Sequence, residues 1–469
     1  MSPRSFQDMS GHASEETPFS ESAHDFGSWN APKTFDESPT SFTSFSLRRL
    51  VAKKISYKAA IGFSLVGIIG LMFVRTSPVG HLGGLRPVGP YELQSVQEGE
   101  TFFDNYNFYD GPDSLGSAGY NVYVSEERAT EAGIANVTKE NVEDAVATSE
   151  SGGSVKKVEE FIYMSSIPSE GGPRESVRLE GKERYDRGLF ILDLRHMPAG
   201  CGIWPAWWLT DEANWPDNGE IDIVEGVNNQ TVAKTALHTS DRCSMFAHVP
   251  AWSKTGHWDW ATGLPDTYTG EMDFNMSKPA DDCWVMAPHQ WANQGCVAVN
   301  SDEISLGGPL NAAGGGIYAL EWDPDKEHAI RSWVFPSRGN VPPNLREAIQ
   351  TANSKDKSMR VVPDPNEWGL PYGYFAIGEG TGCSADHLKN MRLVFNLAFC
   401  GTVAGNRFFM DCPAEAKLFE EEDDPILSCN AFIKSNPNAL KEAYWKIRGL
   451  YVYERTWIKP APSQDEKQS

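Results

Sequence analysis

The sequence predicts an all-β protein whose strands form a sandwich or a barrel. Short runs rich in β-branched and aromatic residues recur between turns made of Gly, Pro and Asn. No long stretch has the periodicity of an amphipathic helix, and only 345–354 indicates a short one. Successive strands without intervening helices are typical of sandwiches and barrels. Examples of the predicted strands are 120–125, 176–181, 188–197, 219–226, 315–322, 330–335, 391–399 and 445–454.

Composition and charge narrow the classes of function. The 469 residues are 40% hydrophobic and 11% aromatic, which is sufficient for one large domain or two ordinary ones. The formal net charge is −23 at pH 7. Nucleic-acid phosphates need a basic surface, so the composition argues against a nucleic-acid partner.

The N-terminal 90 residues are expected to precede the folded domain. Residues 1–47 are rich in Ser, Asp, Glu, Pro and Phe without apolar periodicity, which is typical of disorder. The uncharged run 59–74, extended by 55–58, reaches about 20 residues, enough to span a bilayer. Five basic residues precede this run between positions 48 and 58. The positive-inside rule therefore places the N-terminus in the cytosol.

These features predict a single-pass type II membrane protein whose C-terminal bulk is lumenal or extracellular. The endoplasmic reticulum or Golgi, the vacuole and the cell surface all fit. A cleaved signal peptide is an alternative, but small residues are missing after the apolar run. A buried core helix is another alternative, although nothing amphipathic flanks the run. The predicted divisions are a cytosolic tail at 1–54, a transmembrane anchor at 55–75, a stem linker at 76–90, a globular domain at 91–457 and a disordered tail at 458–469.

Eight cysteines lie in the C-terminal two-thirds, without a CxxC pair or a zinc-ligand spacing. An even number beyond a membrane segment predicts disulfides in an oxidising compartment, with free buried thiols as the alternative. The connectivity stays open, and Cys400 with Cys412 is one local pairing. The three N-x-Ser/Thr sequons, at Asn136, Asn229 and Asn275, all lie on the predicted lumenal side.

The run GEIDIVEG at 219–226 places three acids on a predicted strand. Side chains alternate along a strand, so Glu220 and Asp222 share a face, whereas Glu225 should point the other way. The three acids can form one site only if the strand carries an extra residue. We therefore predict a β-bulge at 223–224, with Ile221 facing the core.

Two carboxyl groups on either side of a glycosidic bond are what retaining glycosidases use. We assign Glu220 as nucleophile, Asp222 as its electrostatic and hydrogen-bonding helper, and Glu225 as general acid/base. Close like charges raise at least one pKa and keep a proton on the acid. The alternatives are solvent-facing acids on an edge strand and a calcium site, although calcium loops favour Gly, Asn and Asp turns.

Tryptophans crowd the segment before these acids, at Trp204, Trp207, Trp208 and Trp215. Indole rings can lie against the apolar faces of sugars, and they equally often fill protein cores. We expect about half of those in WPAWW to be core residues, and Trp215, in a turn, to be exposed.

The tryptophan-rich segment and the acidic run together resemble a known family. WPAWW followed by NWPDNGEIDIVEGVN resembles the laminarinase-like branch of glycoside hydrolase family 16, with its ExDxxE signature. The resemblance continues through 176–208, ALHTSDRC at 236–243, 312–323, 333–345 and 393–405, and covers roughly 91–455.

The resemblance implies a β-jelly-roll sandwich of two curved antiparallel sheets with a concave cleft that binds a β-glucan chain. It implies retaining endohydrolysis of β-1,3 or mixed β-1,3/1,4 bonds by Glu220, Asp222 and Glu225. Trp204 and Trp207 fall on the cleft-side positions of the family, and Trp215 is the expected further substrate contact. His238 falls where the family has a histidine near the acids. No cofactor is required, and the sequence does not support a structural calcium ion.

The chain departs from the family at three places. Val403 stands where the family usually has a tryptophan, and 244–300 contains a Trp-rich insert with Trp252, Trp258 and Trp260. The predicted anchor differs from the secreted enzymes. Two rival functions therefore stay open: a β-glucan transglycosylase with the same covalent intermediate, and a non-catalytic glucan-binding or wall-scaffold protein.

Overall fold

The computed structural model describes residues 85–113, 117–148, 154–245, 257–258, 260–261, 278–288, 290–419 and 423–459. The predicted cytosolic tail and transmembrane anchor lie outside these ranges, as does most of the stem linker. Within the described ranges, no helix is long and apolar enough to cross a bilayer.

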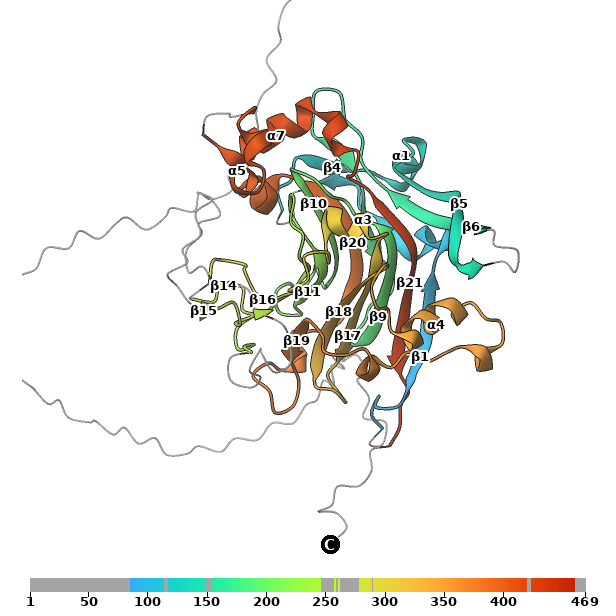
Figure 1. The fold of residues 1–469 in the computed structure, drawn as a ribbon. Helices are drawn as coiled ribbons and strands as arrows, with labels where there is room; N and C mark the ends of the chain where they lie inside the picture. Colours follow the sequence, from blue (N-terminus) through green and yellow to red (C-terminus); the bar gives the residue numbers. More distant parts are fainter. Residues whose placement is uncertain are drawn as a thin grey trace, which may run out of the picture. The chain divides into compact units, whose positions relative to one another are not determined.

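Two antiparallel sheets of eight strands each, stacked face to face, form the described domain (Figure 1). The first, here called the support sheet, has the order β19-β18-β17-β9-β21-β6-β5, with β1 also paired to β21. Its strands are β1 (Tyr91–Gln97), β5 (Ala135–Thr148), β6 (Ser154–Met164), β9 (Gly188–His196), β17 (Gly316–Asp323), β18 (Ala329–Pro336), β19 (Gly373–Ala376) and β21 (Trp445–Arg455).

The second sheet contains the predicted acidic strand and is here called the acid sheet. Its order is β13-β16-β12-β11-β10-β20-β8-β2. Its strands are β2 (Tyr106–Phe108), β8 (Arg178–Gly181), β10 (Ile203–Thr210), β11 (Glu220–Glu225), β12 (Lys234–His238), β13 (His257–Trp258), β16 (Cys296–Val299) and β20 (Arg392–Phe399). The acidic strand β11 is thus internal to its sheet, between β10 and β12.

Two small sheets and several short helices complete the described domain. One small sheet joins β3 (Gly111–Pro112), β4 (Asn121–Tyr123) and β7 (Arg174–Ser176), and the other joins β14 (Trp260–Ala261) and β15 (Lys278–Pro279). The α-helices are α1 (Glu126–Glu131), α3 (Gly307–Ala312), α4 (Pro343–Thr351), α5 (Phe408–Asp411), α6 (Pro413–Ala416) and α7 (Pro425–Ser435).

The core lies between the two sheets, where alternate side chains of facing strands meet. Phe190, Leu192 and Leu194 of β9 pack in one buried cluster with Ile221 of β11. Leu189 and Ile191 of β9 are buried on the other face, in a cluster that includes Leu345 of α4. The first half of β9 is therefore apolar on both faces, which explains its run of consecutive hydrophobic residues.

The sandwich and the eight predicted strands are confirmed, and α4 corresponds to the predicted short helix. All eight cysteines are paired, which confirms the prediction of disulfides. The suggested pairing of Cys400 with Cys412 is wrong, because Cys400 pairs with Cys429, 29 positions on, and Cys412 pairs with Cys201, 211 positions away. The four bonds are Cys201–Cys412, Cys243–Cys383, Cys283–Cys296 and Cys400–Cys429.

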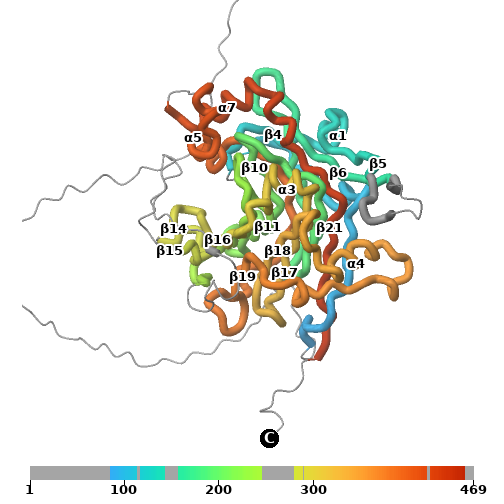
Figure 2. Tube along the Cα trace, in the orientation of Figure 1, coloured from blue at the N-terminus to red at the C-terminus, as the bar shows by residue number. Residues whose placement is uncertain are grey.

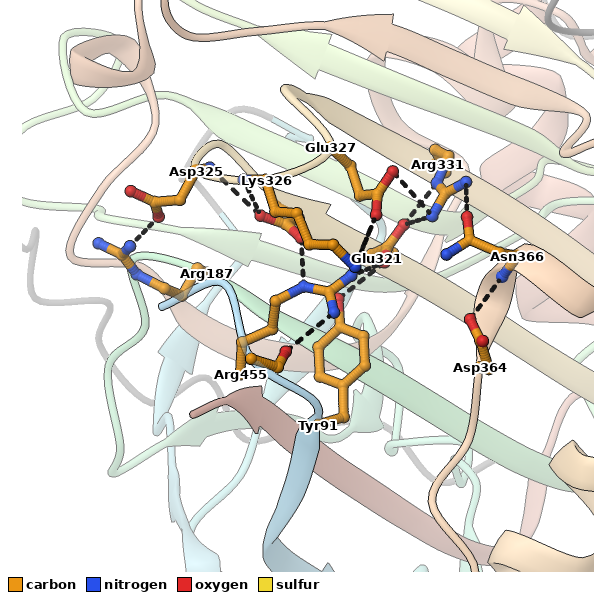
Figure 3. A network of polar contacts seen from close by, with 12 residues as sticks. Tyr91, Arg187, Glu321, Asp325, Lys326, Glu327, Arg331, Asp364, Asn366 and Arg455 are labelled. Atoms are coloured by element: carbon orange, nitrogen blue, oxygen red, sulfur yellow. Dashed lines mark hydrogen bonds and ion pairs between the residues drawn. The ribbon is translucent and has the colours of Figure 1, made fainter. Parts of the chain in front are cut away.

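A charged network ties the two ends of the domain together (Figure 3). Arg455, near the end of β21, reaches Asp323 at 2.5 Å and Glu321 at 3.2 Å, and Tyr91 of β1 donates its hydroxyl proton to Glu321 at 2.8 Å. Glu321, Asp323 and Glu327 lie close enough together to hold a metal ion. Arg455 and Arg331 already supply cationic partners to these acids. In the chain trace, β1 and β21 run side by side (Figure 2).

Candidate active site

The three acids lie on β11, and the strand is bulged between them. Glu220 and Asp222 pair with β12 in register, and Glu225 resumes the pairing only after a shift between Asp222 and Glu225. The pairing with β10 shifts at the same place, because Trp207 faces Val224 and Trp208 faces Asp222, which leaves Ile223 as the extra residue. Residues directly opposite on paired strands share a face. The predicted bulge is confirmed, and it turns Glu225 to the same side as Glu220.

His238 of β12 lies across from Glu220 and connects the acids. Its Nε2 is 3.0 Å from Asp222 Oδ2 and 4.0 Å from Glu220 Oε1. The ligand atoms of these three side chains all lie within 4.8 Å of one another, so the same group could hold a metal ion. The short contact between His238 and Asp222 instead gives each of them a protein partner. The histidine that the resemblance placed near the acids is therefore in contact with them.

Two tryptophans on the same face of the acid sheet donate indole hydrogen bonds to side chains beside or within the acid cluster. The Trp204 Nε1–H donates to Glu225 Oε1 at 2.7 Å, and the Trp208 Nε1–H donates to Asn396 Oδ1 at 2.8 Å. Arg178 of β8 covers the ring of Trp208, with its guanidinium carbon 5.2 Å from the ring centroid. These contacts hold the side chains beside the acids in defined orientations.

Burial and mutual repulsion set the charges of the cluster. Burial, followed by the negative charge of Asp222, raises the pKa of Glu220 to about 8 and that of Glu225 to about 7. Burial alone would lower the pKa of His238, but its hydrogen bond and charge interaction with Asp222 outweigh burial and raise the pKa to about 9. The cluster therefore carries a positive imidazolium and retains protons on its glutamates near neutral pH.

The predicted substrate-contact tryptophans divide between the two faces of the sheet. Trp215 is 41% exposed, as expected, and Trp204 is half-buried on the acid face. Trp207 has no exposed surface and stacks on Phe395 inside the core. The expectation that Trp207 lines the substrate site is therefore wrong. Its position three residues after Trp204 places it on the opposite face of a regular strand.

Trp208 and Asn396 are the residues of the acid face that the sequence interpretation did not select. The alternation that predicted the bulge could have identified Trp208, because Trp204, Ala206 and Trp208 share one face. Asn396 pairs directly with Ala206 and so belongs to the same face. No local sequence feature marks Asn396, because its place depends on the pairing of β20 with β10.

Val403 and part of the Trp-rich insert, two of the places where the chain departs from the family, lie within the described residues. Val403 is half-buried in the short π-helix Gly401–Gly405 that follows β20. The side chains of Trp252, Trp258 and Trp260 lie outside the described part of the chain, as does most of the insert. The backbone of 257–258 pairs with β16 at the edge of the acid sheet.

The fold and the site together define a β-sandwich glycoside hydrolase: three acids and a histidine converge beside indoles on the internal strand of one sheet. Residues 106–453 match the family model described as "XgeA-like, catalytic GH16 domain", where GH16 is glycoside hydrolase family 16. The chain belongs to this family.

Individual similar proteins agree with this family. A probable endo-1,3(4)-beta-glucanase of Aspergillus fumigatus is 33% identical over 366 residues, which cover 78% of this chain and 45% of that protein. The chain thus spans less than half the length of this relative. A solved laminarinase 16A of Phanerochaete chrysosporium, with beta-glucans in its donor and acceptor sites, is similar with a TM-score of 0.57 and 27% identity, covering 77% of this chain and 99% of that chain. An elongating family 16 beta-1,3-glucosyltransferase is similar with a TM-score of 0.56 and 29% identity, over the same shares of the two chains.

Proposed function

We propose that the domain is a retaining, endo-acting hydrolase of β-1,3 or mixed β-1,3/1,4 glucans. The observation that carries this proposal is the bulge in β11, which brings Glu220, Asp222 and Glu225 to one face of the acid sheet. A strand without the bulge would send Glu225 into the core. The bulge therefore places the carboxyl groups of Glu220 and Glu225 on the same face, as a two-carboxylate mechanism requires.

In this proposal the two glutamates have different tasks. Glu220 attacks the anomeric carbon and forms a glycosyl-enzyme, while Glu225 protonates the departing oxygen and then activates the water. The imidazolium of His238, 4.0 Å from Glu220, favours the ionised nucleophile. The raised pKa of Glu225 keeps the proton that the leaving group needs.

The pKa values alone would assign these tasks in the opposite order, because the pKa of Glu220 is raised further than that of Glu225. The assignment to Glu220 follows the placement of the histidine cation and the family resemblance. Chemical rescue of alanine variants distinguishes the two assignments.

The choice of substrate is supported by the names of similar proteins. The Aspergillus fumigatus relative is described as a probable endo-1,3(4)-beta-glucanase, and the Phanerochaete chrysosporium structure contains beta-glucans. The half-buried Trp204 and the exposed Trp215 supply aromatic surface beside the acids, of the kind that sugar rings contact.

Transglycosylation is the second candidate function. The similarity to an elongating beta-1,3-glucosyltransferase favours it, because that protein shares the fold over 77% of this chain. Both reactions share the glycosyl-enzyme, and they differ only in whether water or a sugar hydroxyl resolves it.

We also propose that the domain is lumenal or extracellular and is held by a single transmembrane segment at 55–75, in a type II orientation. The charge asymmetry around that segment supports this orientation. The four disulfides support an oxidising compartment.

Incubation of the purified protein with laminarin, lichenan and labelled laminari-oligosaccharide acceptors tests the activity. Hydrolysis predicts shorter chains, and transglycosylation predicts labelled products longer than the acceptor. Glu220→Gln and Glu225→Gln should each lose at least about 10³-fold in turnover, whereas Glu183→Gln, at an exposed acid, should not. Full activity in either active-site variant, or binding without turnover in the unaltered protein, contradicts the proposal.

Azide rescue with an activated aryl glycoside tests the two roles. An alanine at the nucleophile position lets azide attack from the vacated face and gives an α-glycosyl azide. An alanine at the acid/base position preserves the covalent intermediate and gives a β-glycosyl azide. We expect the α product from Glu220→Ala and the β product from Glu225→Ala, and the reverse pattern would exchange the assignments.

A further inference from the structure

A groove lies on the outer face of the support sheet, away from the acid sheet. It consists of two cavities of about 250 Å³ and 390 Å³ that share Tyr444 and Lys446 as lining residues. Ile162 and Ile447 point into the core between the sheets, so their neighbours Tyr163 and Lys446 point outward. The proposed reaction does not use this face.

Strand pairing aligns the groove with one row of residues across three strands. Asn136 of β5 pairs with Tyr163 of β6, and Tyr163 pairs with Lys446 of β21. Residues paired in this way share a face of the sheet. Tyr444 extends the row, because its ring centroid is 5.2 Å from that of Tyr163. The other side of Tyr444 continues into His196, whose ring is nearly parallel to it at 3.8 Å.

The groove ends at a glycosylation acceptor sequence. Asn136-Val137-Thr138 is an N-x-Thr sequon, and both Asn136 and Thr138 line the smaller cavity. The Asn136 Nδ2–H donates to the backbone oxygen of Gly133 at 2.8 Å. An N-linked asparagine keeps one N–H on Nδ2, so this hydrogen bond can persist after modification.

We propose that Asn136 carries an N-linked glycan whose proximal N-acetylglucosamine residues lie in this groove against Tyr163 and Tyr444. Attachment forms a bond from Nδ2 to the anomeric carbon of a lipid-pyrophosphate-linked oligosaccharide; the bond from that carbon to the pyrophosphate oxygen breaks, and the amide loses one proton. The proposal rests on the lumenal placement given above.

The chemistry of the groove suits a saccharide that starts at Asn136. Tyrosine rings offer large, rigid apolar faces, and their hydroxyl groups offer hydrogen bonds. The rim carries Glu140 and Lys446, which are 2.6 Å apart, as charged partners for hydroxyl and acetamido groups. A soluble sugar would have to lose its translational freedom to bind here, whereas a glycan tethered at Asn136 does not. The tether therefore favours the chain's own glycan as the occupant.

Site mapping on the full chain, secreted or membrane-bound in a yeast host, tests the attachment. Enzymatic removal of N-glycans in ¹⁸O-water followed by peptide mass spectrometry should label Asn136, and Asn136→Gln should remove that mass. An unmodified Asn136 overturns the proposal. A label at Asn229 or Asn275 without one at Asn136 would locate the failure at Asn136, whereas no label at any of the three sequons would also contradict the lumenal placement.

A double-mutant comparison tests the contact with the groove. Tyr163→Ser should lower the Tm of the glycosylated protein by at least about 2 °C more than it lowers the Tm of Asn136→Gln. Tyr163→Phe keeps the ring and should behave like the unaltered protein. Equal losses in both backgrounds overturn the groove contact, even when the glycan is present.

Soluble laminari-oligosaccharides test the alternative that the groove binds free glucan. Laminarihexaose is titrated calorimetrically into Asn136→Gln and into the double variant that also carries Tyr163→Ser. The two titrations should be the same, because free glucan is not expected to bind in the groove. Binding that Tyr163→Ser removes would identify the groove as a site for free glucan and overturn the proposal. Turnover of laminarin should be the same in Asn136→Gln and in the unaltered protein, because Asn136 lies outside the acid cluster.

Discussion

At the scale of single residues, the site depends on how protons are distributed among Glu220, Asp222, Glu225 and His238. Asp222 contacts His238 at 3.0 Å, and burial together with Asp222 raises the pKa of both glutamates. A deprotonated Glu225 therefore costs the folded protein free energy that it does not cost the unfolded chain. Active-site residues often lower the free energy of unfolding in this way, because the arrangement that catalysis requires is not the most stable one.

The first prediction concerns this cost. The pKa of Glu225 is about 7 in the folded protein and near 4.5 when unfolded, so the folded state binds more protons between these values and loses stability as pH rises through them. Glu225→Gln lacks this loss. Its Tm should exceed that of the unaltered protein by about 2 °C or more at pH 8, and by much less at pH 4.5. A difference that is the same at both pH values contradicts the prediction.

The second prediction concerns the histidine cation. The charge of His238 lowers the pKa of Glu220 against the larger effect of burial. His238→Gln removes that charge, so the acidic limb of the pH profile of kcat/KM should move to higher pH. His387→Gln is the control, because His387 lies in a 3₁₀ turn outside the acid cluster and contacts Ser240. An unchanged acidic limb in His238→Gln would show that His238 acts only in folding.

At the scale of elements, β10 and β11 decide which side chains meet the substrate. The bulge at Ile223 turns Glu225 toward Glu220, and the regular alternation of β10 separates Trp204 and Trp208 from Trp207. The bulge could be predicted from the sequence because three acids in one site require it. The family motif predicts Trp207 at the cleft, whereas the two-residue period of β10 places its side chain in the core.

The third prediction compares the two tryptophans. Trp204→Phe removes the indole N–H that donates to Glu225 Oε1, a hydrogen bond that lowers the pKa of Glu225. The basic limb of kcat/KM should therefore move to higher pH with little loss of stability. Trp207→Leu should lower the free energy of unfolding by about 2–4 kcal/mol, because it empties part of the core. Its pH profile should be unchanged, and a shifted profile would contradict the division between the faces.

The fourth prediction concerns the charged network between β1, β17 and β21 (Figure 3). Arg455→Met leaves Glu321 and Asp323 buried with one cation fewer, and should cost about 3–5 kcal/mol of unfolding free energy. Arg187→Met breaks a more exposed pair with Asp325 and should cost less than about 1 kcal/mol. Denaturant unfolding of the two variants measures both values, and equal costs would contradict the structural role given to Arg455.

At the scale of the whole molecule, the sequence was sufficient for the architecture but not for its connections. The eight named strands, among them the acidic strand, follow from local periodicity, and the sandwich follows from these strands together with the family motifs. The disulfide pairing does not, because Cys201–Cys412 and Cys243–Cys383 each join residues at least 140 positions apart. Asn396 likewise reaches the site only through the pairing of β20 with β10. Such contacts depend on tertiary structure, which local patterns do not encode.

The two-sheet architecture gives the domain two outer faces, and we propose a saccharide site on each of them. The acid sheet carries the proposed hydrolytic site, and the outer face of the support sheet carries the groove at Asn136. The two surfaces belong to different sheets on opposite sides of the core. Loss of the glycan and loss of turnover should therefore be separable in variants of each.

The stereochemistry of the first product tests the central claim most directly, because a covalent intermediate on one carboxylate inverts the anomeric carbon twice. Proton NMR during the first minutes of laminarihexaose hydrolysis should show the β-anomer at the new reducing end, with the α-anomer appearing later by mutarotation. An initial α-anomer would show a single inversion, and would contradict a nucleophile at Glu220 with an acid/base at Glu225.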